Sequence, residues 1–181
     1  MRVLIVSGEP LALRPITYGL PSSWDVRTVE ALAPDLQALI DKFEKPNEIP
    51  PEEARLAVRE AVRRAEGEVR DWEPDALVGI GFGGDVVAIL RAQRFWKGGA
   101  VVVNPTGLYR YTPTLVRSGE SVGECVWVVT GPGTRHSSSR MRSLTEKGRA
   151  TSVVYANASE AIYGTGFLAS CVTLASHSQA A

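Results

Sequence analysis

The stretch that decides the fold is residues 76–92, ALVGIGFGGDVVAILRA. Aliphatic residues and glycines fill its first six positions, which predicts a buried strand over residues 76–81. Gly83 and Gly84 follow, and apolar residues then recur at helical spacing, which predicts a helix over residues 85–96. A strand, a glycine turn and a helix in direct succession are typical of α/β folds.

The same alternation of strand and helix extends in both directions from this stretch. Apolar runs predict strands over residues 2–7, 99–104, 125–130 and 151–156. Residues 24–30 alternate apolar and polar side chains, which predicts a half-buried edge strand, and periodicity predicts helices from residues 34, 51, 137 and 166. Six strands that alternate with helices indicate an α/β fold: a three-layer α/β/α sandwich around a mostly parallel, six-stranded sheet. We expect one domain over residues 1–181, in which residues 105–123 form a long loop or a small flap over a pocket.

Composition excludes several classes of protein. Hydrophobic residues make up 44% and charged residues 22% of the 181 residues, which excludes a disordered tail, a collagen-like repeat and a coiled coil. Twenty basic and twenty acidic side chains cancel, and this balance argues against a nucleic-acid partner. No apolar run is long enough to span a membrane, and Glu9 interrupts the N-terminus before a signal peptide core forms. Two cysteines are too few for a zinc site or disulfide framework, so we expect a reducing, cytoplasmic location.

The glycine turn fits two motifs. As G-x-G-x-x-G, Gly79, Gly81 and Gly84 match the dinucleotide-binding fingerprint, in which N–H groups at a helix start bind a pyrophosphate. However, the turn does not follow the first strand, and the next strand ends in Asn104 rather than in an acidic residue for the ribose. As G-x-[nucleophile]-x-G, the turn consists of Gly79, Gly81 and Gly83.

On this second motif the chain resembles the α/β-hydrolase family, whose members typically carry a serine in GxSxGG between a strand and a helix. The resemblance covers nearly the whole chain. RVLIVSG is similar to the strand before the oxyanion loop, WDVRTVE to the strand after that loop, and VVVNP to the strand after the elbow helix. CVWVVTGPGT is similar to the strand whose turn supplies the acid, and VVYA followed by YGTGF to the last strand and the histidine loop. The resemblance implies an α/β-hydrolase-like sheet with a minimal cap.

The hydrolytic triad is missing from the matching positions. The nucleophile position is Gly81, the acid position is Thr134, and the histidine position is Thr165 or, with a shift in the loop, Tyr163. A serine hydrolase needs a nucleophile, a base and an orienting acid, so hydrolysis by this triad is not expected. The resemblance leaves the Phe82 N–H as an oxyanion donor, with added space where the serine would be.

Three side chains are candidates for proton transfer. His136 follows the acid-type turn and is the best single candidate, because imidazole titrates near neutral pH. Glu9 lies in the loop after the first strand, and Asp85 opens the helix after the glycine turn. Each also has a structural interpretation: an exposed loop histidine, a surface carboxylate, and a helix N-terminal residue that interacts with the dipole.

The substrate-binding candidates belong to the glycine turn or to loops after the strands: Gly81, Phe82, Arg14, Asn104, Tyr109, Tyr111 and Tyr163. A guanidinium can clamp a carboxylate, an amide can hydrogen-bond a substrate, and tyrosine rings can stack over a ligand. Surface charge, a strand stop before Pro105 and ordinary packing explain the same residues equally well. Trp24 either lines the mouth of this pocket or covers an edge of the sheet.

These observations lead to a functional hypothesis with alternatives. We expect an atypical α/β-hydrolase-fold enzyme that acts on a small organic or peptidyl carbonyl substrate by proton transfer, as an epimerase, cyclase or lyase in specialised, natural-product biosynthesis. The alternatives are a non-catalytic pseudo-hydrolase that binds a ligand or partner, a hydrolase or acyltransferase whose nucleophile has moved to Ser7 or to residues 137–139, and a dinucleotide-binding protein. We expect no cofactor, no metal and no membrane or nucleic-acid partner, and leave a homodimer open.

Overall fold

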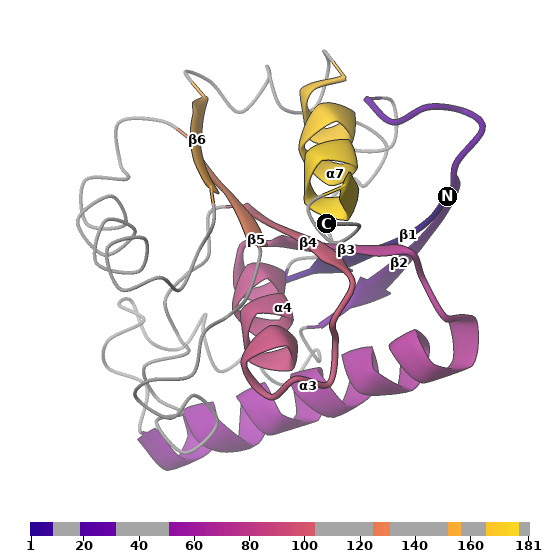
Figure 1. The fold of residues 1–181 in the computed structure, drawn as a ribbon. Helices are drawn as coiled ribbons and strands as arrows, with labels where there is room; N and C mark the ends of the chain where they lie inside the picture. Colours follow the sequence, from indigo (N-terminus) through magenta and orange to yellow (C-terminus); the bar gives the residue numbers. More distant parts are fainter. Residues whose placement is uncertain (9–18, 32–50, 104–124, 131–151, 157–165, 178–181) are drawn as a thin grey trace.

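The computed structural model describes residues 1–8, 19–31, 51–103, 125–130, 152–156 and 166–177, which form six strands and three helices (Figure 1). The helices are α3 (Pro51–Trp72), α4 (Phe82–Ala92) and α7 (Phe167–His177). The strands are β1 (Arg2–Ser7), β2 (Asp25–Glu30), β3 (Ala76–Ile80), β4 (Gly99–Val103), β5 (Cys125–Thr130) and β6 (Ser152–Ala156). Side-chain burial is described for β1–β4, and backbone pairing for all six strands.

All neighbouring strands are parallel, in the order β2-β1-β3-β4-β5-β6. From β1 the chain first adds β2 on one side and then, after α3, adds β3 on the other side. The order of the strands therefore reverses at β1, and the carboxyl ends of β1 and β3 flank the switch point. In open parallel sheets, ligands bind outside the carboxyl ends of the strands at such a point.

Helices cover both faces of the sheet (Figure 1). Leu4 and Val6 of β1 belong to the buried cluster with α3 and α4, whereas Val3 and Ile5 belong to the cluster with α7. Successive side chains of a strand point to opposite faces, so a strand covered on both sides is apolar throughout. The predicted α/β fold with a parallel sheet is therefore confirmed.

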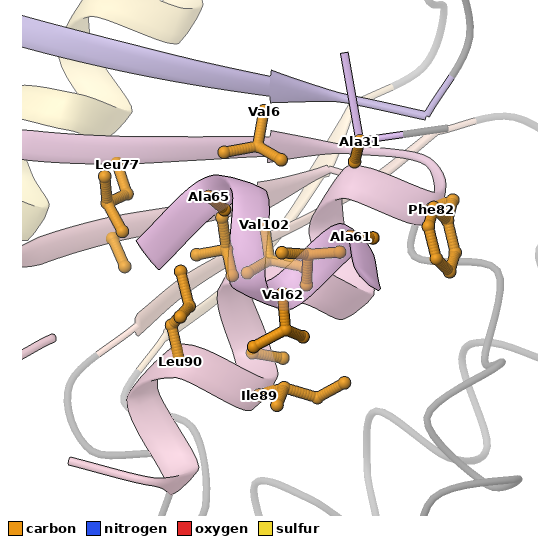
Figure 2. Close-up of a cluster of buried hydrophobic side chains, with 14 of the residues drawn as sticks. Val6, Ala31, Ala61, Val62, Ala65, Leu77, Phe82, Ile89, Leu90 and Val102 are labelled. Carbon is orange, nitrogen blue, oxygen red and sulfur yellow. The ribbon is translucent and has the colours of Figure 1, made fainter. Parts of the chain in front are cut away.

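Helix α3 buries the face that its periodicity predicts. Val58, Ala61, Val62 and Ala65 are at most 5% exposed and pack in the same cluster as α4 (Figure 2). The opposite face is charged: Glu60 lies 3.0 Å from Arg63, and both side chains are exposed. None of the described helices has the length and apolar character needed to cross a lipid bilayer.

The strand boundaries agree with the prediction to within one residue, but the helix after the glycine turn does not. Helix α4 begins at Phe82, three residues before the predicted start at Asp85, and ends at Ala92 rather than at Trp96. Gly83 and Gly84 are its second and third residues, because the missing side chains let its first turn approach the sheet. The helices predicted from residues 34 and 137 and the flap over 105–123 lie outside the described residues.

Candidate functional site

The turn between β3 and α4 consists of one residue, Gly81. Its backbone has φ 57° and ψ −124°, a combination that L residues with a side chain rarely adopt. The Gly81 N–H donates to the Val103 carbonyl at 2.9 Å, and its own carbonyl accepts from the Gly84 N–H at 2.9 Å. These two bonds attach the turn to β4 on one side and to the first turn of α4 on the other.

Two flanking glycines let α4 pack directly on the strands. A Cβ atom on Gly79 would lie 2.5 Å from the Gly83 carbonyl oxygen, and one on Gly83 would overlap the Val6 carbonyl oxygen. Both contacts are shorter than real Cβ atoms make. In both cases the opposing atom belongs to the backbone, which cannot turn aside as a flexible side chain could. The glycines of the G-x-G-x-G motif at positions 79 and 83 are therefore required by close backbone approach.

Gly81 differs from these glycines, because the position of its missing side chain is open. No described atom lies within 4 Å of where its Cβ would be. The nucleophile turn of α/β-hydrolases likewise holds its residue in a strained backbone that exposes the side chain above the sheet. At Gly81 the strained backbone is present and the side chain is replaced by space.

Gly8 brings the end of β1 against this turn. A Cβ on Gly8 would lie 2.6 Å from Phe82 Cβ and 2.9 Å from Phe82 N, and the Gly8 N–H donates to the Ile80 carbonyl at 3.3 Å. The segment after β1 therefore starts in contact with the residue that follows Gly81. The sequence reasoning did not single out Gly8, although a glycine directly after a buried strand was the available signal.

Phe82 has two parts with different environments. Its side chain is 3% exposed and lies at one edge of the cluster shared with α3, with Leu77 and Leu90 at the other (Figure 2). Its N–H belongs to the first turn of α4, where N–H groups have no partner within the helix and the helix dipole favours negative charge. The buried Phe82 ring fixes the position of the start of α4, and the Phe82 N–H is a hydrogen-bond donor suited to an anion.

Ser7 and Asp85 are fully buried beside this turn, and each makes an interaction within the protein. Asp85 lies in the first turn of α4, where a carboxylate interacts favourably with the helix dipole. Burial favours a structural role for Asp85 over general-base catalysis. It also removes Ser7 from contact with solvent, which argues against Ser7 as a relocated nucleophile.

The remaining predicted residues fall into two groups. His136, Glu9, Arg14, Asn104, Tyr109, Tyr111 and Tyr163 lie outside the described residues, as do residues 137–139. Trp24 is described, and it directly precedes the first residue of β2. It therefore lies toward the amino ends of the strands, where it packs against the buried cluster that contains Val3 and Ile5, and this favours the alternative in which it covers an edge of the sheet. Within the described part of the chain, no group of three or more His, Cys, Asp or Glu residues could hold a metal ion.

Comparison with known proteins adds little to this geometry. No protein-family model matches the chain, and no curated protein matches it. A solved structure described as an oxidoreductase from Corynebacterium diphtheriae aligns with 96% of this chain and 98% of its own, at 15% identity and a TM-score of 0.34. A similarity this weak carries no argument about fold family or function.

Proposed function

We propose that this chain is an atypical α/β-hydrolase-fold enzyme without a hydrolytic triad, which binds a small carbonyl or carboxylate compound above Gly81 and transfers a proton next to that carbonyl. The observation that carries the proposal is Gly81 itself: a strained backbone turn at the switch point of the sheet, with open space where a nucleophile would be. An elbow without a nucleophile can still polarise a carbonyl, but it cannot form an acyl-enzyme.

The proposed mechanism uses backbone and side chain separately. A base removes the proton next to the substrate carbonyl, the negative charge moves to the carbonyl oxygen, and the Phe82 N–H stabilises the resulting enolate. The proton then returns to the same carbon, on the same or the opposite face, or the enolate reacts within the substrate. His136 and Glu9 are the proposed proton carriers, and Arg14 and Asn104 the proposed substrate contacts.

The strand order bears on the competing dinucleotide hypothesis. Dinucleotide-binding sheets have the order 3-2-1-4-5-6 and carry their glycine fingerprint after the first strand. Here the order is 2-1-3-4-5-6 and the glycine turn follows the third strand. Flavodoxin-like sheets share the 2-1-3-4-5 order and also bind at the switch point, so FMN belongs among the ligands to be tested.

A cysteine at position 81 tests the geometry directly. In the Gly81→Cys variant the thiol would project into open space at the start of α4, and helix N-termini lower thiol pKa values to between about 3.5 and 7.5. Gly67→Cys is the matched control, because Gly67 lies inside α3 and also has no described atom near its missing Cβ. Alkylation rates against pH, assigned by peptide mapping, give the pKa of each introduced thiol.

We expect the thiol introduced at position 81 to titrate at least about one pH unit below the thiol introduced at position 67. Burial raises the pKa of the native Cys171 thiol to about 11, so Cys171 should stay unlabelled at neutral pH and report intact folding. Small carboxylates and 2-oxo acids should slow alkylation in the Gly81→Cys variant and leave the Gly67→Cys variant unaffected. Equal pKa values for the two introduced thiols, or protection only by FMN or NAD, would contradict the proposed site.

Hydrogen exchange separates an enzyme from a binding protein. Candidate carbonyl compounds are incubated with the native chain in D₂O, and loss of the proton next to the carbonyl is followed by NMR. Catalysed exchange that is lost in His136→Ala or Glu9→Ala, with ligand binding retained, supports proton transfer. Binding without any catalysed exchange supports the non-catalytic pseudo-hydrolase instead.

A further inference from the structure

The outer side of α7 is unusual for an exposed helix because it carries no formal charge. The helix sequence, FLASCVTLASH, contains no Asp, Glu, Lys or Arg, whereas half of the 22 residues of α3 are charged. Ser170, Leu174 and His177 of α7 are nevertheless exposed. Surfaces that are depleted of charge in this way are typical of the centre of a protein–protein interface.

A groove of about 470 Å³ runs beside this surface. Pro21 and Trp24, from the turn before β2, form one wall, and α7 forms the other with Ala169, Ser170, Thr173 and Leu174. Ala169 and Thr173 are four residues apart, as are Ser170 and Leu174, so the four side chains form a continuous stripe along the helix. Figure 1 shows α7 on the opposite face of the sheet from α3.

Three polar side-chain atoms of the groove already have hydrogen-bond partners within α7. The Ser170 hydroxyl donates to the Gly166 carbonyl at 3.2 Å, and the Thr173 hydroxyl donates to the Ala169 carbonyl at 2.9 Å. His177 Nδ1 lies 2.7 Å from the Thr173 carbonyl oxygen, and since that oxygen can only accept, Nδ1–H is the donor of this hydrogen bond. Covering polar groups that keep their partners costs little free energy, so this groove suits an apolar protein surface better than a polar ligand.

A projecting apolar side chain lies at the rim of the same groove. Leu174 is 51% exposed, although α7 buries Leu168 and Val172 completely. An apolar projection beside an apolar groove is self-complementary, because a two-fold axis can place each projection in the groove of the other copy. A helix face without formal charges also meets no like-charge repulsion from its own copy.

From these observations we propose that a second copy of the chain occupies the groove, and that Leu174 of each protomer inserts between α7 and the 21–24 turn of the other. An 11-residue helix is about 16 Å long, so the interface is small, below about 1,200 Å² in total. An interface of this size predicts a reversible dimer that dissociates on dilution.

The proposed interface is distant from Gly81 within the fold. Trp24 precedes β2, and the end of α7 approaches the start of β4, where a Cβ on Gly99 would lie 3.1 Å from Ser176 Cα. The groove is therefore near the amino ends of the strands, while Gly81 follows the carboxyl end of β3. Loss of the dimer and loss of the Gly81 site can thus be measured separately.

Sedimentation equilibrium over a concentration series in the micromolar range tests the proposal. Leu174→Arg places a charge in the interface, and Ser170→Arg places one in the groove from a second exposed position. The matched control is Leu56→Arg, because Leu56 is an exposed leucine of α3, at 60% exposure, away from the groove. We expect the dissociation constant of the dimer to rise at least ten-fold in both groove variants. In Leu56→Arg and Leu174→Met the dissociation constant should stay close to that of the native chain.

Folding is checked in the same samples by circular dichroism and urea denaturation, which should be unchanged because both mutated side chains are exposed. A native chain that stays monomeric over the whole series overturns the proposal and leaves the groove to another protein or a small ligand. Equal weakening by Leu56→Arg and Leu174→Arg also overturns it, since the effect would then be one of net charge.

Discussion

The base and the tip of the β3–α4 turn are both built from glycine, for opposite reasons. At the base, Gly79 and Gly83 are enclosed, and a Cβ on either would collide with backbone atoms. At the tip, Gly81 has no described atom within 4 Å of its missing side chain, and its φ of 57° is what excludes most residues. One motif therefore contains glycines required by packing and a glycine required by backbone conformation. Of these three glycines, only Gly81 at the tip can therefore be replaced by a larger residue without displacing α4.

Gly83→Ala should have the largest effect on stability. The new Cβ would overlap the Val6 carbonyl oxygen, so either α4 or β1 must shift. Overpacking usually costs 1–3 kcal/mol, and because backbone must move on both sides we expect a loss of about 3 kcal/mol or more. Urea denaturation measures the change in the free energy of unfolding; a loss below about 1 kcal/mol would show that the contact is not tight.

Gly79→Ala should destabilise slightly less, by about 2 kcal/mol. Its Cβ would meet Gly83 O at 2.5 Å and Gly84 Cα at 2.6 Å, both in the first turn of α4. A shift of that turn relieves the contact without disturbing β1. A thermal denaturation curve gives the size of the effect, and near-native stability here would mean that α4 is free to move away from β3.

Gly81→Ala tests the open tip and should cost about 1–2 kcal/mol. The cost comes from backbone strain alone, since no described atom opposes the added methyl group. Gly81→Asn is a useful control, because Asn tolerates positive φ better than Ala and should restore part of the loss. If Gly81→Ala were as damaging as Gly83→Ala, the space above the turn would have to be filled.

The sequence predicts the sheet well and the site only in part. Continuous apolar runs such as residues 3–6 are sufficient to predict parallel strands that are buried on both faces. The start of α4 was misplaced because glycine lowers helix propensity, whereas here Gly83 and Gly84 are helical so that backbones can touch. Propensity describes a residue in its own segment, and this contact is made with another strand.

The two surface features depend on contacts that are distant in sequence. Periodicity cannot reveal that Trp24 lies beside α7, because the segments meet only once the sheet has formed. The glycine spacing did identify the turn, but the φ of Gly81 and the open space beside it follow from how β1, β3 and β4 fix the backbone. The sequence alone shows that α7 has no Asp, Glu, Lys or Arg. This composition points to an interface only because the structure shows that Leu174 is exposed.

Gly67→Ala should have the smallest effect, and in the opposite direction. Gly67 lies inside α3, has no described atom within 4 Å of its missing Cβ, and is not among the glycines with positive φ. Alanine there gains helix propensity without a clash, so we expect stabilisation of about 0.5–1 kcal/mol in urea denaturation. A destabilised Gly67→Ala would mean that α3 needs a glycine for an approach by another segment. The expected gain would instead show that, in this chain, the local surroundings of each glycine and not its residue type decide the outcome of substitution.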